Sequence, residues 1–201
     1  PTLGDLAEVR RAQGRYAEAE PLFERALAIR EKLLGPTHPE VAASLNALAM
    51  LWHDRGRYAE GERLSRRALA VLEKALGEGH PEVASGLNVL GGLYLAQGKY
   101  AEAGTLLERS LAAQEKTLGP AHPDVAASLT SVAELHRSQR RYAEAEPLCR
   151  RALAIREKAL GPEHPDVAAS LTHLAGLYSE QGKYAEAEPL YRQALAIQEK
   201  T

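Results

Sequence analysis

Four histidines occur in a repeated setting that would be the first place to look for a metal site. Each is followed directly by proline, and successive copies are 42 residues apart. Their positions are His38, His80, His122 and His164. A zinc ion needs ligands at about 2 Å, whereas residues on successive helix pairs lie about 10 Å apart. No cluster of histidine and cysteine at ligand spacing accompanies them. We therefore expect each histidine to bond its local turn at the start of a helix, without a metal ion.

Nucleophilic chemistry would have to come from Cys149, the only cysteine of the chain. It occupies the position that other copies of the repeat fill with Phe23, Leu107 and Tyr191. A cysteine in such a position behaves as a small buried hydrophobe, and no base recurs beside it in the pattern. The sequence favours a structural cysteine over a catalytic thiol, and a single cysteine excludes an internal disulfide.

Acidic residues recur in pairs, such as Glu144 with Glu146 and Glu186 with Glu188. Residues two apart on a helix do not face each other, so these carboxylates cannot work together as general acid and base, and we expect a solvated face. Glycine-rich phosphate loops, the G-x-S-x-G motif and the H-E-x-x-H motif are absent from the sequence. The sequence therefore predicts a protein with no enzymatic activity and no cofactor.

The elements that carry these residues are five copies of one unit. The segment Tyr-Ala-Glu keeps the same 42-residue step as the histidines, and a period of this size is typical of a solenoid. Each copy buries its apolar face only by stacking on its neighbours. We interpret residues 1–201 as a single array, in which the first copy is truncated at its N-terminal end, and we expect the chain to be part of a longer protein. The copies are residues 1–35, 36–77, 78–119, 120–161 and 162–201.

Each copy predicts a helix, a turn and a second, longer helix. In the last copy Pro165 suits the first helical position, and Gly182 is the expected left-handed cap at the end of that helix. Apolar residues recur between them at steps of four, three and four, on one face; they are Val167, Leu171, Leu174 and Tyr178. The expected apolar face of the second helix is Tyr184, Ala187, Leu190, Tyr191, Ala194, Leu195 and Gln198.

One turn departs from the repeat, because Arg140 replaces the glycine that the other four copies have there. An arginine in the left-handed conformation costs about 1 kcal/mol or more. The sequence therefore leaves two possibilities for this turn: a strained left-handed arginine, or a turn that is built differently from the others.

The packing positions resemble those of the tetratricopeptide repeat, whose spacing is large, large, small, large, then small, large, small. The third copy has this spacing at Leu87, Leu90, Gly91, Tyr94, Ala103, Leu107 and Ser110. Residues 144–168, EAEPLCRRALAIREKALGPEHPDVA, look like the kinesin light chain variety with its longer second helix. The resemblance covers the entire chain. It implies an all-α fold, a right-handed superhelix of five helix–turn–helix repeats that binds protein partners.

One stripe of the first helix in each copy varies while the packing positions recur. Its residues follow one another at steps of four and three, on one side of the helix. They include Arg11, Asn46, Met50, His53, Asn88, Leu95, Thr130, Glu134, Arg137, Thr172 and Ser179. The resemblance implies that this stripe lines a concave groove and that Asn46 and Asn88 bond the main chain of an extended peptide. An amide offers both a donor and an acceptor for that purpose. The other interpretation is a row of ordinary solvated positions.

We expect a protein-interaction scaffold that holds a peptide or partner segment in this groove. Acidic residues in the partner would suit Arg11, His53 and Arg137. Two other hypotheses are a structural or assembly arm, with contacts through its ends or convex face, and the sensor arm of a larger signalling enzyme.

The net charge and hydropathy of the chain argue against some classes of partner. A formal net charge of −2 speaks against nucleic acid or an anionic membrane surface as partner. No apolar run has the length of a membrane-spanning helix, and we expect a cytoplasmic protein. Interior-type faces at both ends of the array predict end-to-end self-association, with Leu190 and Leu195 more exposed than their equivalents Leu148 and Leu153.

Overall fold

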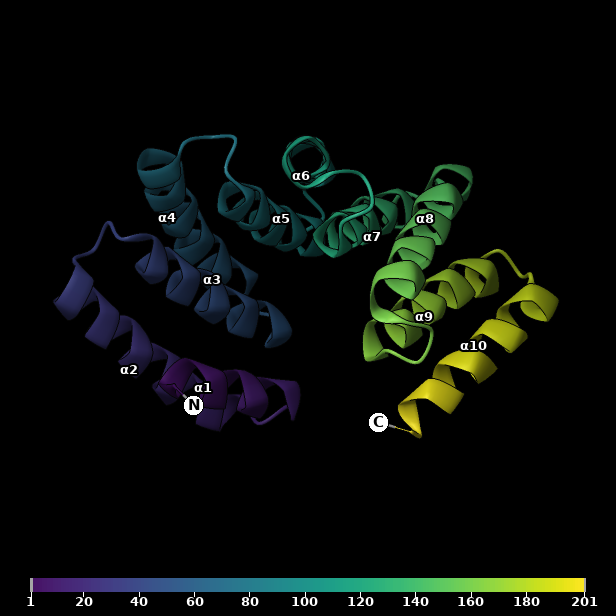
Figure 1. Ribbon diagram of the computed structural model, residues 1–201, viewed down its shortest axis with the longest axis horizontal. Helices are drawn as coiled ribbons and strands as arrows, with labels where there is room; N and C mark the ends of the chain where they lie inside the picture. The colour runs from purple at the N-terminus through teal and green to yellow at the C-terminus, as the bar shows by residue number, and fades with distance from the viewer. Residues whose placement is uncertain (1, 201) are drawn as a thin grey trace. The chain divides into compact units, whose positions relative to one another are not determined.

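The computed structural model describes residues 2–200, which form ten α-helices and contain no β-strand. The helices follow one another in pairs, and the second helix of a pair is the longer one in the first four pairs (Figure 1). Their bounds are α1 (Leu3–Ala12), α2 (Tyr16–Leu34), α3 (Pro39–Asp54), α4 (Tyr58–Leu76), α5 (Pro81–Ala96), α6 (Tyr100–Leu118), α7 (Pro123–Ser138), α8 (Tyr142–Leu160), α9 (Pro165–Glu180) and α10 (Tyr184–Gln198). The fold is therefore all-α, as predicted.

The chain divides into two compact units, Pro1–Ala113 and Gln114–Thr201. Within the first unit each helix from α1 to α5 packs against the next, and α3 also contacts both α1 and α5. Within the second unit α7, α8, α9 and α10 pack in the same consecutive order, and α7 contacts α9. The outermost residues of the first and last predicted copies, Pro1 and Thr201, lie outside the described residues.

The histidine–proline segments form the N-termini of α3, α5, α7 and α9. In each case the histidine is the N-cap, and its Nδ1 accepts a hydrogen bond from the backbone N–H two residues later, at 3.1–3.2 Å. Proline follows at the first helical position, where no N–H is needed. The expectation that these histidines bond their local turns is confirmed. In residues 2–200 no group of three or more histidine, cysteine or acidic side chains could hold a metal ion.

The turn at Arg140 has the same construction as the glycine turns. Arg140 has a φ of 59°, close to the φ of 73° at Gly98. The N–H groups of Arg140 and Arg141 donate to carbonyls three and five residues earlier, at 2.9 and 2.8 Å, and those of Gly98 and Lys99 do the same, both at 2.9 Å. The possibility of a differently built turn is therefore wrong, because five copies impose one hydrogen-bond pattern and Arg140 must adopt its left-handed backbone.

Small residues let the helices of the first unit approach closely. A Cβ atom added at Gly61 would lie 2.8 Å from the Leu93 side chain, and one added at Gly91 would lie 2.6 Å from Leu107. Both glycines occupy the predicted small positions of the repeat.

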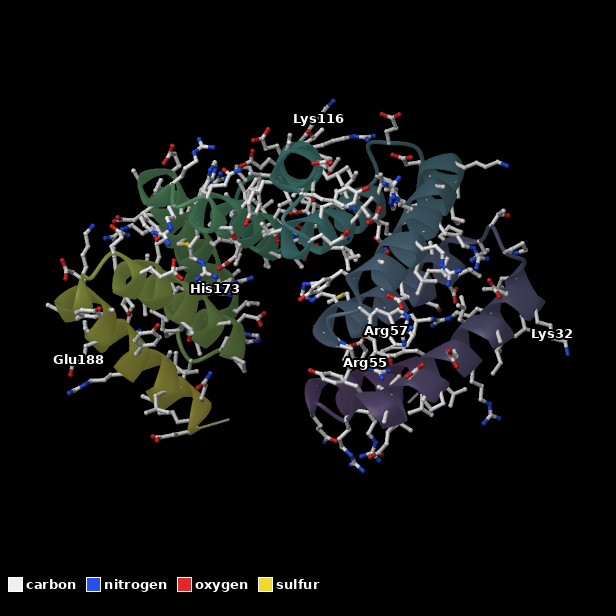
Figure 2. The ribbon with its side chains drawn as sticks, turned by 180° about the vertical axis from the view of Figure 1, so that it is seen from behind. Lys32, Arg55, Arg57, Lys116, His173 and Glu188 are labelled. Carbon is white, nitrogen blue, oxygen red and sulfur yellow. The ribbon has the colours of Figure 1, made fainter. Side chains whose placement is uncertain are left out.

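Trp52 is buried in this unit, and Arg55 and Arg57, labelled in Figure 2, place their guanidinium carbons 5.0 and 4.2 Å from a Trp52 ring centroid.

The second unit buries the predicted face of α9 completely, but the predicted face of α10 only in part. Val167, Leu171, Leu174 and Tyr178 are at most 5% exposed. On α10, however, Tyr184, Tyr191 and Leu195 are 70%, 40% and 54% exposed. The predicted apolar face of α10 is therefore only partly covered, and in residues 2–200 α9 is the helix against which α10 packs.

The predicted difference in leucine exposure between α10 and α8 holds at one of two positions. Leu195 is exposed whereas Leu153 is half-buried, as predicted, but Leu190 is half-buried like Leu148. Ile197, also on α10, is only 5% exposed.

In the second and fourth copies, one glutamate side chain accepts hydrogen bonds from the following copy. The Tyr178 hydroxyl donates to Glu146 at 2.8 Å, and Arg150 donates to that hydroxyl at 2.5 Å. The equivalent Glu62 accepts hydrogen bonds from Arg66, Gln97 and Lys99 at 2.9–3.0 Å. Burial of Glu62 disfavours its charged form, but these hydrogen bonds outweigh burial and lower its pKa to about 2. The prediction of a solvated face is therefore wrong for Glu146, although Glu144 is exposed.

The strained turn gives a prediction about stability. Replacing Arg140 with glycine removes the left-handed strain and should stabilise the protein by about 1 kcal/mol, which raises its melting temperature by about 2–4 °C. The reciprocal change, Gly98→Arg, should cost a similar amount, because nothing lies within 4 Å of a Cβ added there and only the backbone is strained. Calorimetry of both variants checks this; an Arg140→Gly variant that melts below the wild type would refute the explanation.

Candidate functional site

The predicted stripe lies on the first helices of the pairs. In the first unit Met50 and His53 of α3 and Asn88 of α5 lie together around a hollow of about 170 Å³, which we call the first hollow. Its remaining lining residues are Val89, Gly92 and Leu93. Gly92 leaves space here, since nothing lies within 4 Å of a Cβ added to it. Aliphatic side chains and a glycine thus surround one asparagine amide and one imidazole.

The two asparagines have incomplete hydrogen bonding. The side-chain carbonyl oxygen of Asn88 is buried, and within residues 2–200 it has no hydrogen-bond partner. The carbonyl oxygen of Asn46 accepts from the Ser65 hydroxyl at 3.4 Å. Buried polar atoms in folded proteins are nearly always paired, so the Asn88 amide has an unused acceptor beside a hollow.

Arg11 is already paired with two carboxylates. Its guanidinium donates to Glu8 at 2.9 Å and to Asp54 at 2.6 Å, and Asp54 also lies 3.4 Å from Nδ1 of His53. Burial opposes the charged form of Arg11, but these carboxylates outweigh it and raise its pKa. The His53 ring lies against the Tyr58 ring, with 5.6 Å between centroids. The predicted positive charge at this position is therefore neutralised within the protein.

The second unit repeats the same site with different chemistry. A hollow of about 290 Å³, the second hollow, is lined by Glu134, Arg137, Thr172, His173, Gly176 and Tyr191. The first five of these residues stand 84 residues, or two copies, after lining residues of the first hollow. Glu134 replaces Met50 and Arg137 replaces His53, so a mainly apolar lining becomes a charged one.

Glu134 is held in its charged form by its neighbours. Arg137 donates to it at 2.9 and 2.6 Å, and Nδ1 of His173 lies 2.9 Å from it; His173 is labelled in Figure 2. Burial of Glu134 would raise its pKa, but these partners lower it. Arg137 donates a further hydrogen bond to Glu180 at 2.5 Å, so this arginine is paired as Arg11 is.

The remaining stripe residues contribute less. The hydroxyls of Thr130 and Thr172 donate to carbonyls of their own helices, both at 2.9 Å. They therefore offer a ligand no free amide of the kind found at Asn88. Leu95 and Ser179 are half-buried and lie outside both hollows.

The sequence prediction missed several lining residues. Val89 and His173 follow the asparagine position directly along α5 and α9, and Tyr191 was assigned to the apolar face of α10. Glu180, which binds Arg137, lies in the next copy. Val89 and His173 occupy the same position of the repeat, 84 residues apart. This was the one signal in the sequence that could have identified them as lining residues.

Cys149 lies in the apolar core of the second unit, as predicted, and is 7% exposed. Burial raises the pKa of its thiol to about 11, so it carries no reactive thiolate near neutral pH. None of the helices in residues 2–200 is both long enough and apolar enough to cross a membrane.

Comparisons with known proteins agree on the repeat. A family model for the tetratricopeptide repeat matches residues 1–55, 49–116, 82–148 and 124–200. The structure of a putative kinesin light chain from Podospora anserina with nearly identical TPR-like repeats is 34% identical, over 98% of this chain and 94% of that one, with a TM-score of 0.69. The comparison with curated proteins gave no match.

Two more distant structures share the fold. BtubC (BKLC) from P. vanneervenii is 24% identical, over 98% of this chain and 79% of that one, with a TM-score of 0.74. A Rap protein complexed with competence and sporulation factor is 18% identical, over 97% of this chain and 52% of that one, with a TM-score of 0.84.

The paired Glu134 gives a prediction about pH. Because its folded-state pKa is lowered, its stabilisation is present above the unfolded-state pKa of about 4.3 and is lost as the pH falls through that value toward the lower folded-state pKa. Glu134→Gln should cost about 1–3 kcal/mol at pH 7, and the difference from the wild type should shrink between about pH 5 and pH 3. Urea unfolding at several pH values measures this. The control is Glu186→Gln, at an exposed position, which should follow the wild type; a pH-independent cost for Glu134→Gln would contradict the assignment.

Proposed function

The chain belongs to the tetratricopeptide repeat family, in its kinesin light chain-like form, and on that premise we propose that it is a protein-interaction scaffold whose stripe binds an extended segment of a partner. The buried, unpaired carbonyl oxygen of Asn88 beside the first hollow is the observation that supports this most directly.

The two asparagines supply complementary groups for a peptide main chain. Rotation of the Asn88 amide about its last side-chain bond would turn its unpaired carbonyl toward a peptide N–H in the hollow. The Asn46 carbonyl is occupied by Ser65, so its N–H₂ group is the part that can donate to a peptide C=O. Main-chain recognition of this kind does not depend on the ligand's side chains, and the shape of the hollow would supply the selectivity.

The lining of the first hollow favours an apolar side chain in the ligand. Met50 is 38% exposed and lies with Val89 and Leu93 around the space that Gly92 leaves open. Transfer of an apolar side chain from water to such a lining is favourable by about 25 cal/mol per Å² of buried surface. Ordering a flexible segment offsets much of this gain, so we propose modest affinity.

Preference for acidic ligands becomes a secondary part of the proposal. Arg11 already binds Glu8 and Asp54, and Arg137 already binds Glu134 and Glu180. An acidic ligand residue would have to displace one of these carboxylates and would gain only the difference between two similar interactions.

The groove proposal predicts a specific loss of binding. Peptides selected from a random library against the immobilised chain should bind Asn88→Ala about 1–3 kcal/mol more weakly, because a peptide group loses its partner. Fluorescence polarisation with the selected peptides measures the affinity. Thr105→Ala is the matched control, since that hydroxyl bonds its own helix, α6, outside the stripe. If the double variant Asn46→Ala/Asn88→Ala retains wild-type affinity, the groove model is wrong.

We also propose that copies of this chain associate end to end. Tyr191 is 40% exposed, whereas its equivalents Phe23, Leu107 and Cys149 are at most 7% exposed. On α1, Leu6 and Val9 are also exposed. Because the copies are so similar, the first repeat of one chain could cover α10 of another, in a heterologous contact that does not close.

Self-association predicts a mass that rises with concentration. Sedimentation velocity over a hundredfold range of concentration should show oligomers, and Leu195→Glu should abolish them by placing a charge in the contact. The control is Leu160→Glu on α8, an exposed leucine outside the first and last copies. A monomer at every concentration would exclude this contact.

A further inference from the structure

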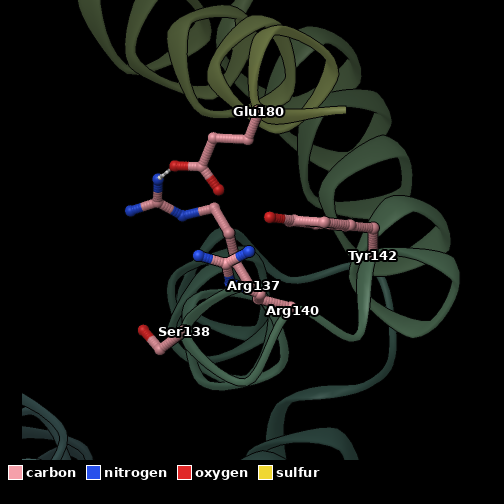
Figure 3. Close-up of a pocket in the computed structure, with 5 residues that line it drawn as sticks. All are labelled: Arg137, Ser138, Arg140, Tyr142 and Glu180. Atoms are coloured by element: carbon pink, nitrogen blue, oxygen red, sulfur yellow. Dashed lines mark hydrogen bonds and ion pairs between the residues drawn. The ribbon is translucent and has the colours of Figure 1, made fainter. Parts of the chain in front are cut away.

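A cleft at the turn between α7 and α8 lies beside the stripe and shares Arg137 with it. It has a volume of about 430 Å³ and is lined by Arg137, Ser138, Arg140, Tyr142 and Glu180, all in the second unit (Figure 3). Figure 3 shows Arg137 reaching Glu180 on one side, while the hydroxyl of Tyr142 points toward the arginines from the start of α8. We call this space the turn cleft.

Arg140 is the unusual residue of the turn cleft. It holds a φ of 59° where four other copies have glycine, so its side chain is kept at the cost of backbone strain. Its guanidinium forms no hydrogen bond or ion pair within the described part of the chain, whereas neighbouring Arg137 and Arg141 are both paired with carboxylates. Strain retained for an unpaired cation beside a cleft indicates a role outside the fold.

The first copy supplies an internal comparison. Arg11, Ala12, Gly14, Tyr16 and Asp54 occupy the positions that correspond, 126 residues earlier, to the lining of the turn cleft. Both places contain an equivalent ion pair to the following copy: Arg11 binds Asp54, and Arg137 binds Glu180. Two features are added in the fourth copy: a second arginine in place of Gly14 and a hydroxyl in place of Ala12.

We propose that the turn cleft binds a phosphoryl group carried by a side chain of the partner segment; this rests on the proposed function. A phosphoryl group presents three acceptor oxygens and a charge of about −1.5 to −2. The cleft offers two guanidinium groups and the hydroxyls of Ser138 and Tyr142. Paired N–H donors of arginine match phosphate oxygens well.

Charge favours a phosphoryl group over a carboxylate. Arg137 already binds two carboxylates, those of Glu134 and Glu180, so a carboxylate ligand would only exchange one carboxylate partner for another. A dianion can bind both arginines and displace Glu180, whose side chain is 41% exposed and can turn into water. Glu180 thus acts as an internal competitor that lowers affinity for weaker anions.

The turn cleft adjoins the second hollow through a shared residue. Arg137 lines both spaces. A segment that lies along the second hollow could therefore place a phosphorylated residue at the turn cleft without leaving the second unit. The cleft would then select among partner segments by their phosphorylation state.

The test uses a short phosphoserine peptide, acetyl-Ala-Ala-pSer-Ala-Ala-amide, titrated into the full chain at constant ionic strength. Arginine side-chain NMR signals report binding, and the unphosphorylated peptide is the reference. We expect saturable binding of the phosphopeptide, at least tenfold weaker in Arg140→Gly even though that variant melts about 2–4 °C higher. Glu180→Gln should bind severalfold more tightly, because the internal competitor is removed. Equal affinity of Arg140→Gly and wild type would overturn the proposal.

Two further variants and one further ligand complete the design. The double change Ala12→Ser/Gly14→Arg copies the turn cleft into the first unit and should create a second site of similar affinity; Arg141→Gln, which removes the neighbouring arginine, should leave binding unchanged. Inorganic phosphate is titrated in parallel. If it binds more tightly than the phosphopeptide, the site serves free phosphate and the assignment to a partner side chain is overturned.

The result is separable from that of the groove. Asn46 and Asn88 lie in the first unit, so Asn46→Ala/Asn88→Ala should leave the phosphoserine titration unchanged. If Asn46→Ala/Asn88→Ala retains wild-type peptide affinity while Arg140→Gly still weakens phosphopeptide binding, the turn cleft is an anion site and the groove model is wrong. Loss of the Arg140 effect with intact groove binding would refute the turn cleft alone.

Discussion

The close approach of neighbouring helices at residues with little or no side chain is the constraint on which the rest of this structure depends. At Gly61 and Gly91 even a methyl group would lie within 3 Å of a neighbouring side chain. Interiors packed this tightly tolerate little change in volume. The packing side of each helix is therefore fixed, and the side that faces away from the core carries the differences between copies.

The features that the sequence predicted correctly are those that a copy determines by itself. The histidine caps and the left-handed turns follow from local backbone geometry, and the small positions follow from the repeat. The errors concern contacts between copies. Tyr191 has the buried position of Phe23, yet it is exposed because exposure depends on the neighbouring helix pair. Glu146 was assigned to solvent because its partner Tyr178 lies in the next copy.

The candidate site shows the same division. The stripe could be read from the repeat, but the neutralisation of Arg11 and Arg137 could not, since Asp54 and Glu180 are 43 residues further along the chain. Both hollows use equivalent positions, one with Met50 and Asn88, the other with Glu134 and Thr172. One backbone thus presents two chemically distinct surfaces, and charge and hydrogen bonding, rather than fold, set what each can bind.

The position of Trp52 has a consequence for spectroscopy. It is the only tryptophan of the chain, it is buried in the first unit, and the guanidinium carbon of Arg57 lies 4.2 Å from a centroid of its indole ring. Fluorescence excited selectively at the indole therefore reports the environment of the first unit alone. Circular dichroism, in contrast, follows the helices of both units. A difference between the two unfolding curves would show that the first unit unfolds separately from the rest of the array. Such separate unfolding is expected for repeat proteins whose copies contact only their neighbours.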